Sequence, residues 1–330
     1  MSSVTVSQLW RFPVKSMGGN QVDHLRIDRR GVHADRLWAV RDVEKGITAS
    51  ARRLPVLLGC SARYAEEPGP AAGPGNVPRV IITMPDGREL IDDDPGIHDA
   101  LSDLVGREMR LTALPPHDDT SQHRMSVNDS LNTFSDAMVR QDFGLDETEA
   151  LPDTSVFSTR QIITLARYST PPGTFVDLSP VHLMSTASLR DLAADGEPYS
   201  VRRFRPNVLV DVAEPDREFP ESAWVNGELV IGGVTLRVTN PTIRCVVPTR
   251  PQPDLELNRA LTKQLAQRTN RFLGIYADVR TPGTVRVGDE VRVHLASPPN
   301  AVRRAATAAN KAATKGAQKL LEATVLRGRT

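Results

Sequence analysis

Cysteine is scarce in this sequence, which has two thiols, Cys60 and Cys245, in 330 residues. Two cysteines cannot form a disulfide framework in a chain of this length. By themselves they also cannot ligate a zinc ribbon or an iron–sulfur cluster. Such low cysteine usage is typical of a reducing compartment, so we expect a cytoplasmic protein.

A strong net charge and long apolar segments are also missing. The formal net charge is +1, which excludes a global attraction to nucleic acid or to an anionic membrane. No run approaches the roughly 18 apolar residues of a membrane span, and no charged segment followed by an apolar one marks a signal peptide. Any anion-binding site must therefore be built locally from a few side chains.

The residues that are present favour a β-rich protein with two domains. The length of the chain exceeds the size at which one hydrophobic core usually stops growing. Its 25 prolines and 22 glycines are spread along the chain and favour many short strands and turns over long helices. Short strands at close spacing up to about residue 112 indicate a barrel or a sandwich.

Alternating apolar residues locate several elements of the first half. They predict a first strand over 4–10 and a hairpin over 80–91, and an acidic start followed by apolar residues predicts a helix over 97–105. Residues 54–64 are predicted to form one apolar strand containing Cys60, which we interpret as a packing residue. Residues 115–157 are polar and acidic with few strand signals, and we interpret them as a connector or an active-site lid.

The most distinctive stretch of the second half surrounds Cys245. A hairpin is predicted over 228–239, and the pair Asn240–Pro241 is expected to end its second strand. Arg244 stands next to Cys245, and a cation favours the thiolate, the form that acts as a nucleophile or a metal ligand. Adjacent residues of an extended chain point to opposite faces, so the two side chains converge only if the backbone turns. The alternative is that Cys245 is a small buried hydrophobe.

The remainder of the chain is predicted to contain a helix, a hairpin and a basic tail. Leucines spaced by four residues predict a helix over 254–273, and alternating apolar residues predict a final hairpin over 285–295. The tail, residues 297–330, is basic and rich in alanine, and we expect it to be helical or disordered. It leaves nucleic-acid binding open, although a solubilising appendage explains it equally well.

Two further polar patterns have ordinary explanations when each is taken alone. Ser185 and Thr186 precede an apolar-periodic run, as helix caps do, and a helix start exposes N–H groups that suit an anion. Arg202, Arg203 and Arg205 crowd the approach to a strand, where arginines usually form a solvated face.

Four motifs, taken in order along the chain, resemble those of the MOSC-domain proteins, including bacterial two-domain members and the mitochondrial amidoxime reducing component. They are Arg11-Phe12-Pro13-Val14-Lys15-Ser16, Asp35-Arg36-Leu37-Trp38, Phe204-Arg205-Pro206-Asn207 and Arg244-Cys245. The resemblance covers roughly residues 4–64 and 180–295. It implies a mostly β fold with helices (α+β), in which two β-barrel-like domains, at 1–112 and 180–296, hold a cofactor site between them. Residues 113–179 would be the connector or lid.

The same resemblance implies a molybdenum cofactor, a pterin dithiolene with a terminal phosphate. Cys245 would be the metal ligand and the catalytic residue, because a soft thiolate suits a metal that already carries dithiolene sulfurs. Ser185 and Thr186 would offer hydroxyl and N–H groups to the phosphate. The remaining cofactor-binding residues would be Lys15 and Arg36 from the first domain and Arg205, Asn207 and Arg244 from the second.

The leading functional hypothesis is a molybdenum oxidoreductase that reduces small N-hydroxylated or N-oxide compounds. The cysteines leave no iron–sulfur site and no glycine fingerprint offers nicotinamide binding, so a separate electron-transfer protein would supply the electrons. Substrate preference stays open, because Val-Val-Pro-Thr-Arg-Pro follows Cys245 where the mitochondrial proteins have an acidic, threonine-rich loop.

Two hypotheses of other classes compete with the enzyme. The superfamily includes the C-terminal part of molybdenum cofactor sulfurases, so Cys245 could carry a persulfide in a sulfur-carrying or cofactor-handling protein. The pyridoxal phosphate domain that generates sulfur in those proteins has no counterpart here. The third hypothesis is a non-catalytic module that binds an anion through its arginines.

Overall fold

A computed structural model describes residues 3–194 and 196–296 of the chain. The basic tail predicted at 297–330 lies outside these residues. The described protein is mostly β with helices, as the sequence predicts. None of its helices has the length and apolar character that crossing a membrane requires.

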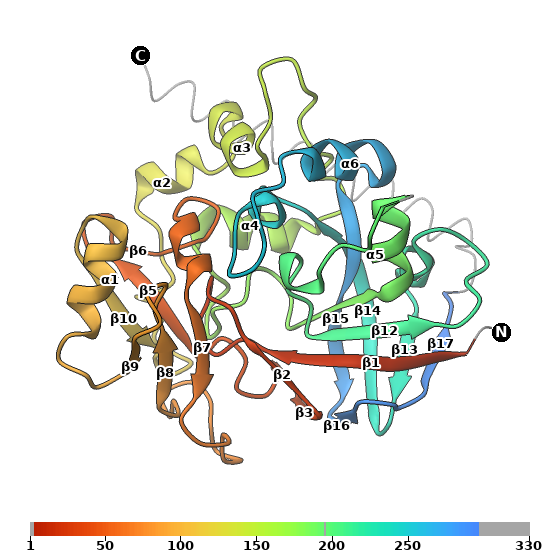
Figure 1. Ribbon diagram of the computed structural model, residues 1–330, viewed down its shortest axis with the longest axis horizontal. Coiled ribbons are helices and arrows are strands. Elements are labelled where there is room, and N and C mark those ends of the chain that lie inside the picture. The colour runs from red at the N-terminus through yellow and green to blue at the C-terminus, as the bar shows by residue number, and fades with distance from the viewer. Residues whose placement is uncertain (1–2, 195, 297–330) are drawn as a thin grey trace.

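An eight-stranded sheet forms the right-hand half of the molecule in Figure 1. The predicted hairpin is present in it, because β13 and β14 pair antiparallel on either side of a turn at Gly232, where φ is +56°. In spatial order the strands are β17 (Val291–His294), β13 (Glu228–Ile231), β14 (Val234–Ile243), β15 (Phe272–Thr281), β11 (Val181–Ser185), β12 (Val208–Val212), β1 (Val4–Arg11) and β2 (Asn20–Val22).

The first strand of the chain belongs to this sheet. β1 pairs antiparallel with β12, with Val4 opposite Val212. Outside the sheet, β3 (His24–Asp28) pairs with β16 (Gly283–Arg286) and with β4 (Gly31–Val32). The start of the chain therefore packs with strands of the second half. The domain boundary expected at residue 112 remains a prediction.

We call the half that contains the eight-stranded sheet the second lobe. The first lobe, at the left in Figure 1, contains two small sheets and the α-helix α1. Cys60 is fully buried in its hydrophobic cluster and packs as predicted. One sheet contains β10 (Met109–Ala113), β5 (Trp38–Asp42) and β6 (Ile47–Thr48), the other contains β7 (Ser61–Tyr64), β8 (Val80–Thr83) and β9 (Glu89–Ile91), and the helix is α1 (Ile97–Val105).

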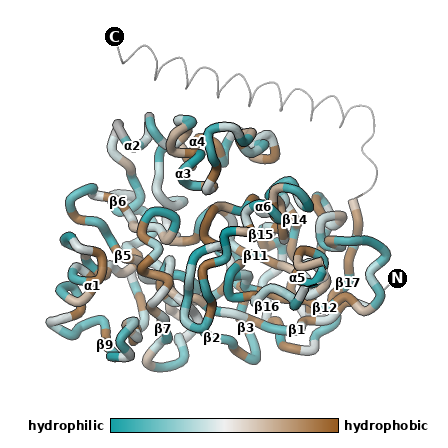
Figure 2. The backbone as a smooth tube through the Cα atoms, turned by 45° about the horizontal axis from the view of Figure 1, so that its top comes forward, coloured by the Kyte–Doolittle hydropathy of each residue, from teal (hydrophilic) through white to brown (hydrophobic). Residues whose placement is uncertain are grey.

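Residues 113–179, which we call the helical segment, contain α2 (Val127–Asn132), α3 (Asp136–Phe143) and α4 (Thr159–Arg167). Each helix begins after a serine whose side chain accepts a hydrogen bond from the first turn: Ser126, Ser135 and Ser158. Figure 2 shows the three helices grouped at the top of the molecule, away from α1 and from α5 (Thr186–Ala193). The segment expected to lack strands is therefore an ordered helical layer.

The predicted strand over 54–64 is confirmed only at its end, where β7 begins at Ser61. A 3-10 helix over Pro55–Gly59 comes first, and Cys60 joins it to β7. Proline lacks an N–H group and has a φ that suits the first turn of a helix, so Pro55 starts a helical turn in an apolar run. Apolar content alone did not reveal this turn.

The prediction that Asn240–Pro241 ends a strand is also wrong, because β14 continues to Ile243. Irregular register on both sides of Pro241 accommodates the proline. β13 pairs only with the first part of β14, from Val234 to Arg237, so the Pro241 end has a neighbour, β15, on one side. Proline is tolerated in a strand at such an edge.

The final predicted hairpin is wrong and the last helix is shorter than predicted. Residues around Gly288 turn, but β16 pairs with β3 and β17 pairs with β13, so the two arms separate. The helix, α6, spans Ala260–Thr269. The Asn258 side chain caps it by accepting a hydrogen bond from Leu261 N at 3.1 Å, and Asn270 ends it with φ at +49°.

Candidate functional site

A cavity of about 270 Å³ lies between the two lobes and the helical segment. Both lobes contribute cations to its wall, whereas the helical segment contributes mainly apolar side chains. Those apolar residues include Phe134, Val139, Phe143, Phe157 and Leu165. Six predicted site residues meet in the wall of this cavity: Lys15, Arg36, Arg205, Asn207, Arg244 and Cys245.

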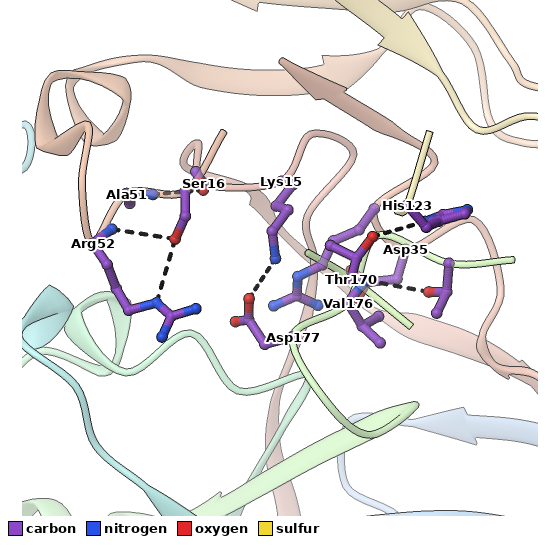
Figure 3. A network of polar contacts seen from close by, with 12 residues as sticks. Lys15, Ser16, Asp35, Ala51, Arg52, His123, Thr170, Val176 and Asp177 are labelled. Carbon is purple, nitrogen blue, oxygen red and sulfur yellow. Dashed lines mark hydrogen bonds and ion pairs between the residues drawn. The ribbon is translucent and has the colours of Figure 1, made fainter. Parts of the chain in front are cut away.

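Lys15 enters the cavity from the turn that follows β1. Its backbone N–H donates to Trp38 O at 2.8 Å, and Ser16 turns the chain with φ at +70°. The buried ammonium donates a hydrogen bond to Asp177, and Figure 3 shows the two side chains pointing at each other. Burial is the main cause that lowers the pKa of Lys15, Asp177 opposes it, and Arg36 adds to the lowering.

Asp177 was not predicted as a site residue. It faces the cavity from the loop before β11. Partial removal from bulk water disfavours its charged form, although the side chain is 67% exposed, and the positive charges of Lys15, Arg36 and Arg52 outweigh that effect and hold the pKa of Asp177 well below its ordinary value. No local pattern marks this residue, because its partner Lys15 lies 162 positions earlier.

Arg36 and Arg205 lie on the ring of Phe12. Their guanidinium carbons are 4.8 Å and 4.4 Å from the ring centroid. Both residues have left-handed backbones, with φ of +52° and +56°, a strained conformation that concentrates at functional sites. Arg36 pairs with Asp35, which accepts a hydrogen bond from Phe12 N at 2.8 Å. One aromatic ring therefore positions a cation from each lobe.

Arg205 has a free donor. Its Nη1 donates to Met17 O at 2.5 Å, but Nη2 is buried without a hydrogen-bond partner among the described residues. Burial, reinforced by Arg36, lowers its pKa to about 9, so the guanidinium remains charged at neutral pH. A buried charged donor with no partner is costly, and an anion in the cavity would satisfy it.

The guanidinium of Arg244 is held by hydrogen bonds within the protein. Its Nε donates to Leu273 O at 2.8 Å, its Nη1 donates to Phe204 O at 3.1 Å, and its Nη2 lies 2.7 Å from His182 Nε2. Burial lowers its pKa to about 10, whereas burial and the charge of Arg244 lower the pKa of His182 well below its ordinary value. His182 is therefore neutral and can accept the Arg244 hydrogen bond.

Asn207 links β1 to β11 and also lines the cavity. Its Oδ1 accepts from His182 N at 3.3 Å, and its Nδ2 donates to Trp10 O at 3.4 Å. The amide therefore holds the start of the Lys15 turn against the strand that carries His182.

Cys245 lies two residues after the end of β14, just before a 3-10 helix at Val247–Thr249. Its thiol is half-buried and lines the cavity. Burial raises the pKa of the thiol, and the charge of Arg52 is the strongest influence in the opposite direction. The expected neighbour Arg244 has its guanidinium bound elsewhere, so Arg52 is the cation that favours the thiolate. Sequence spacing did not indicate it.

Ser185 and Thr186 are not among the residues that line the cavity. Ser185 Oγ donates to the buried Glu221 at 2.6 Å and also caps α5, while Thr186 Oγ1 donates to Asp211. Both hydroxyls are therefore used by carboxylates within the second lobe. Ser185 is a helix cap, as its ordinary explanation predicts, and Thr186 is the first residue of that helix.

The described residues contain no group of three or more His, Cys, Asp or Glu side chains that could hold a metal ion. Cys245 is thus a lone soft ligand beside a cluster of cations. Such a site suits an anionic cofactor whose metal is soft and already carries most of its donor atoms.

Two family models match the chain: the MOSC domain over residues 171–292 and the MOSC N-terminal beta barrel domain over residues 3–90. Mitochondrial amidoxime reducing component 2 from Bos taurus is 26% identical over 308 residues, and the protein of that name from Rattus norvegicus is 28% identical over 313 residues. Each alignment covers 87% of this chain and 82% of the relative. The crystal structure of the YuaD protein from Bacillus subtilis aligns with a TM-score of 0.41 and 14% identity, covering 89% of this chain and 97% of that one.

Proposed function

Because this chain belongs to the MOSC-domain family, we propose that it is a molybdenum-cofactor-dependent oxidoreductase that reduces N-hydroxylated or N-oxide compounds. The observation that carries the proposal is that Cys245 shares one cavity with Lys15, Arg36 and Arg205. The names of the relatives point to an N–O bond as the substrate group.

The charges of the cavity fit the phosphate of a molybdenum cofactor. A phosphate monoester carries about −1.5 to −2 at neutral pH. Lys15, Arg36, Arg205 and Arg244 provide four positive charges, and the carboxylates that pair with Lys15 and Arg36 provide two negative ones. Among these six groups the surplus is two positive charges, which would suit a dianion, and Arg205 Nη2 is the donor among them that lacks a partner in the described residues.

Cys245 would hold the metal through its thiolate, next to the cofactor's own sulfurs. When bound, the cofactor would supply a metal centre that takes part in oxygen-atom removal by changing oxidation state. Arg36 and Arg205 would bind and orient the anionic end. Tyr276 lines the same cavity, and because burial raises the pKa of its hydroxyl, it keeps its proton and can donate a hydrogen bond to the substrate oxygen.

The proposed reaction converts an N–OH group, two electrons and two protons into an N–H group and water. The cysteine count leaves no iron–sulfur site in this chain, so we propose that a separate electron-transfer protein delivers the electrons. The apolar side chains of the helical segment would exclude bulk water from the reacting group. We therefore propose that the segment acts as a lid over the site.

The test is expression in a host that makes molybdopterin, followed by metal analysis and an activity assay. We expect about one molybdenum per chain. We also expect reduction of N-hydroxybenzamidine with reduced viologen as the electron donor and no turnover with NADH or NADPH alone.

The outcomes separate the competing functions. Persistent absence of molybdenum would overturn the cofactor assignment and favour the two other hypotheses, a sulfur-carrying protein and a non-catalytic anion-binding module. Molybdenum-loaded protein that stays inactive with viologen would favour a sulfur-carrying or cofactor-handling role for Cys245. Turnover with a nicotinamide alone would refute the need for a partner protein.

A further inference from the structure

Two further arginines of the cavity wall, Arg52 and Arg53, are not among the cations assigned to the cofactor. They lie in a turn after β6, where Arg53 N and Leu54 N both donate to Ser50 O, at 3.0 and 2.8 Å. Ala51 N donates to Ser16 Oγ at 2.9 Å, so this turn is fixed against the Lys15 turn, as Figure 3 shows. Their side chains remain 37% and 29% exposed.

Both arginines form an ion pair with the same carboxylate, Asp142 of the helical segment. Asp142 Oδ2 lies 3.0 Å from Arg52 Nη1, and Asp142 Oδ1 lies 3.5 Å from Arg53 Nε. The Asp142 side chain is 8% exposed, yet its Oδ1 makes no hydrogen bond with any described residue. Two guanidinium groups thus share the one Asp142 carboxylate, which forms a hydrogen bond with Arg52 and only a longer contact with Arg53.

The shared carboxylate lies next to the segment that carries the cysteine. Asp142 O accepts a hydrogen bond from Val246 N at 3.0 Å, and Val246 directly follows Cys245. A Cβ added at Gly144, just after α3, would approach Val246 Cγ2 to 3.0 Å. The end of α3 is therefore packed against the residue beside the proposed metal ligand.

We propose that Arg52 and Arg53 form a second anion subsite, which binds a carboxylate of the substrate, and that Asp142 occupies this subsite until substrate arrives. The group seen on the arginines is itself a carboxylate, which identifies the chemistry that they accept. A free carboxylate can align with a planar guanidinium and form two parallel charge-assisted hydrogen bonds, an arrangement that Asp142 does not reach. A substrate held there would have its remaining atoms directed along the cavity toward Cys245.

The proposal also gives the helical segment a role in substrate entry. Its carboxylate is the side chain that ties α3 to the turn of Arg52 and Arg53. When a substrate carboxylate displaces Asp142, α3 loses this side-chain tie, while the hydrogen bond from Val246 N to Asp142 O still holds the end of α3 beside Cys245. The identity of the N–O substrate rests on the function proposed above, whereas the binding of a carboxylate does not.

The direct test measures binding of benzoate to the cofactor-free full-length chain by isothermal titration calorimetry. In Asp142→Asn the competing carboxylate is absent, so we expect benzoate to bind at least about fivefold more tightly than in the wild type. Adding Arg53→Gln to Asp142→Asn should remove this gain in benzoate affinity. Adding Lys45→Gln, which removes one charge from an exposed lysine of the same cavity wall, should preserve it.

Three results would overturn the subsite. The first is that Asp142→Asn does not bind benzoate more tightly than wild type, and the second is that the tighter binding persists after Arg53→Gln is added. The third is that Arg53→Gln and Lys45→Gln lower the benzoate affinity equally. The last would mean that benzoate responds only to the general positive potential. Circular dichroism of each variant confirms folding, and Asp142→Ser provides a second way to remove the carboxylate if the Asn variant does not fold.

A kinetic test links the subsite to the reaction. The molybdenum-loaded wild type should have a higher kcat/KM for a ring-carboxylated N-hydroxybenzamidine than for the uncharged parent compound, and Arg53→Gln should lower that ratio about tenfold, mainly through KM. If neither compound is reduced, the proposed function fails and the benzoate titration still decides the subsite. If both are reduced with an unchanged ratio in Arg53→Gln, the subsite fails and the reductase stands.

Discussion

Lys15 and Asp177 form an ion pair across the cavity, although 162 positions of sequence separate them. Lys15 comes from the turn after the first strand, and Asp177 comes from the end of the helical segment, just before β11. The pair therefore closes a contact between the first lobe and the start of the second. Burial lowers the pKa of the Lys15 ammonium, Asp177 acts against this by favouring the charged form, and Arg36 adds to the lowering.

The charge of Asp177 should stabilise the fold in a pH-dependent way. Its pKa is depressed in the folded protein, so its contribution is fully present above the unfolded value of about 3.8 and is lost as the pH falls through the folded value. Asp177→Asn should lower the free energy of unfolding at neutral pH, and the difference from wild type should shrink below pH 3.8. Urea unfolding at several pH values measures this difference. Adding Lys15→Met should restore part of the loss, because no buried charge is then left unpaired.

Glu221 should have the opposite pH dependence. Burial raises its pKa, although hydrogen bonds from Ser185 and Ser188 act against this. The folded state therefore holds its proton more tightly, so the contribution is fully present below the unfolded value of 4.5 and is lost as the pH rises through the folded value. Glu221→Gln cannot ionise, so the unfolding free energy of wild type relative to this variant should fall as the pH rises. Glu147→Gln, on the exposed loop after α3, is the matched control. A pH-independent difference for Glu221→Gln would contradict the assignment.

Cys245 and Cys60 should respond differently to replacement by alanine. Cys245→Ala should lose the protein sulfur from the metal, so X-ray absorption should show about three sulfurs in wild type and one fewer in the variant. Cys60 is buried in the first-lobe cluster and burial raises its pKa to about 12, so it is an inert thiol. Cys60→Ala should keep metal and activity and lose about 1–2 kcal/mol of stability. An unchanged sulfur count in Cys245→Ala would remove this residue from the metal site.

Arg205 should be needed for cofactor occupancy. Arg205→Ala removes a buried charge-assisted donor, and we expect cofactor binding to weaken by about 2 kcal/mol, roughly thirtyfold, with the fold intact. Arg202→Ala is the control, because Arg202 does not line the cavity and donates to Pro253 O at the surface. Molybdenum content per folded chain measures both. Full occupancy in Arg205→Ala would show that this arginine does not bind the cofactor.

The sequence by itself determined the features that depend on neighbouring residues. The hairpin of β13 and β14 and the helix α1 follow from alternation, turn residues and apolar periodicity, which act within a few positions. Six predicted site residues also meet in one cavity, because their motifs mark turns and strand ends that the fold brings together.

Tertiary structure decided everything that depends on which distant segments meet. The membership of β1 in the far sheet, the continuation of β14 through Pro241 and the separate partners of β16 and β17 each depend on a neighbouring strand that the local sequence does not specify. Ser185 left the predicted site because the fold places Glu221 against it, and Asp177 and Arg52 entered the site because folding places them beside Lys15 and Cys245. The charge and burial of a group are set by such long-range neighbours, so no local pattern could have identified these residues.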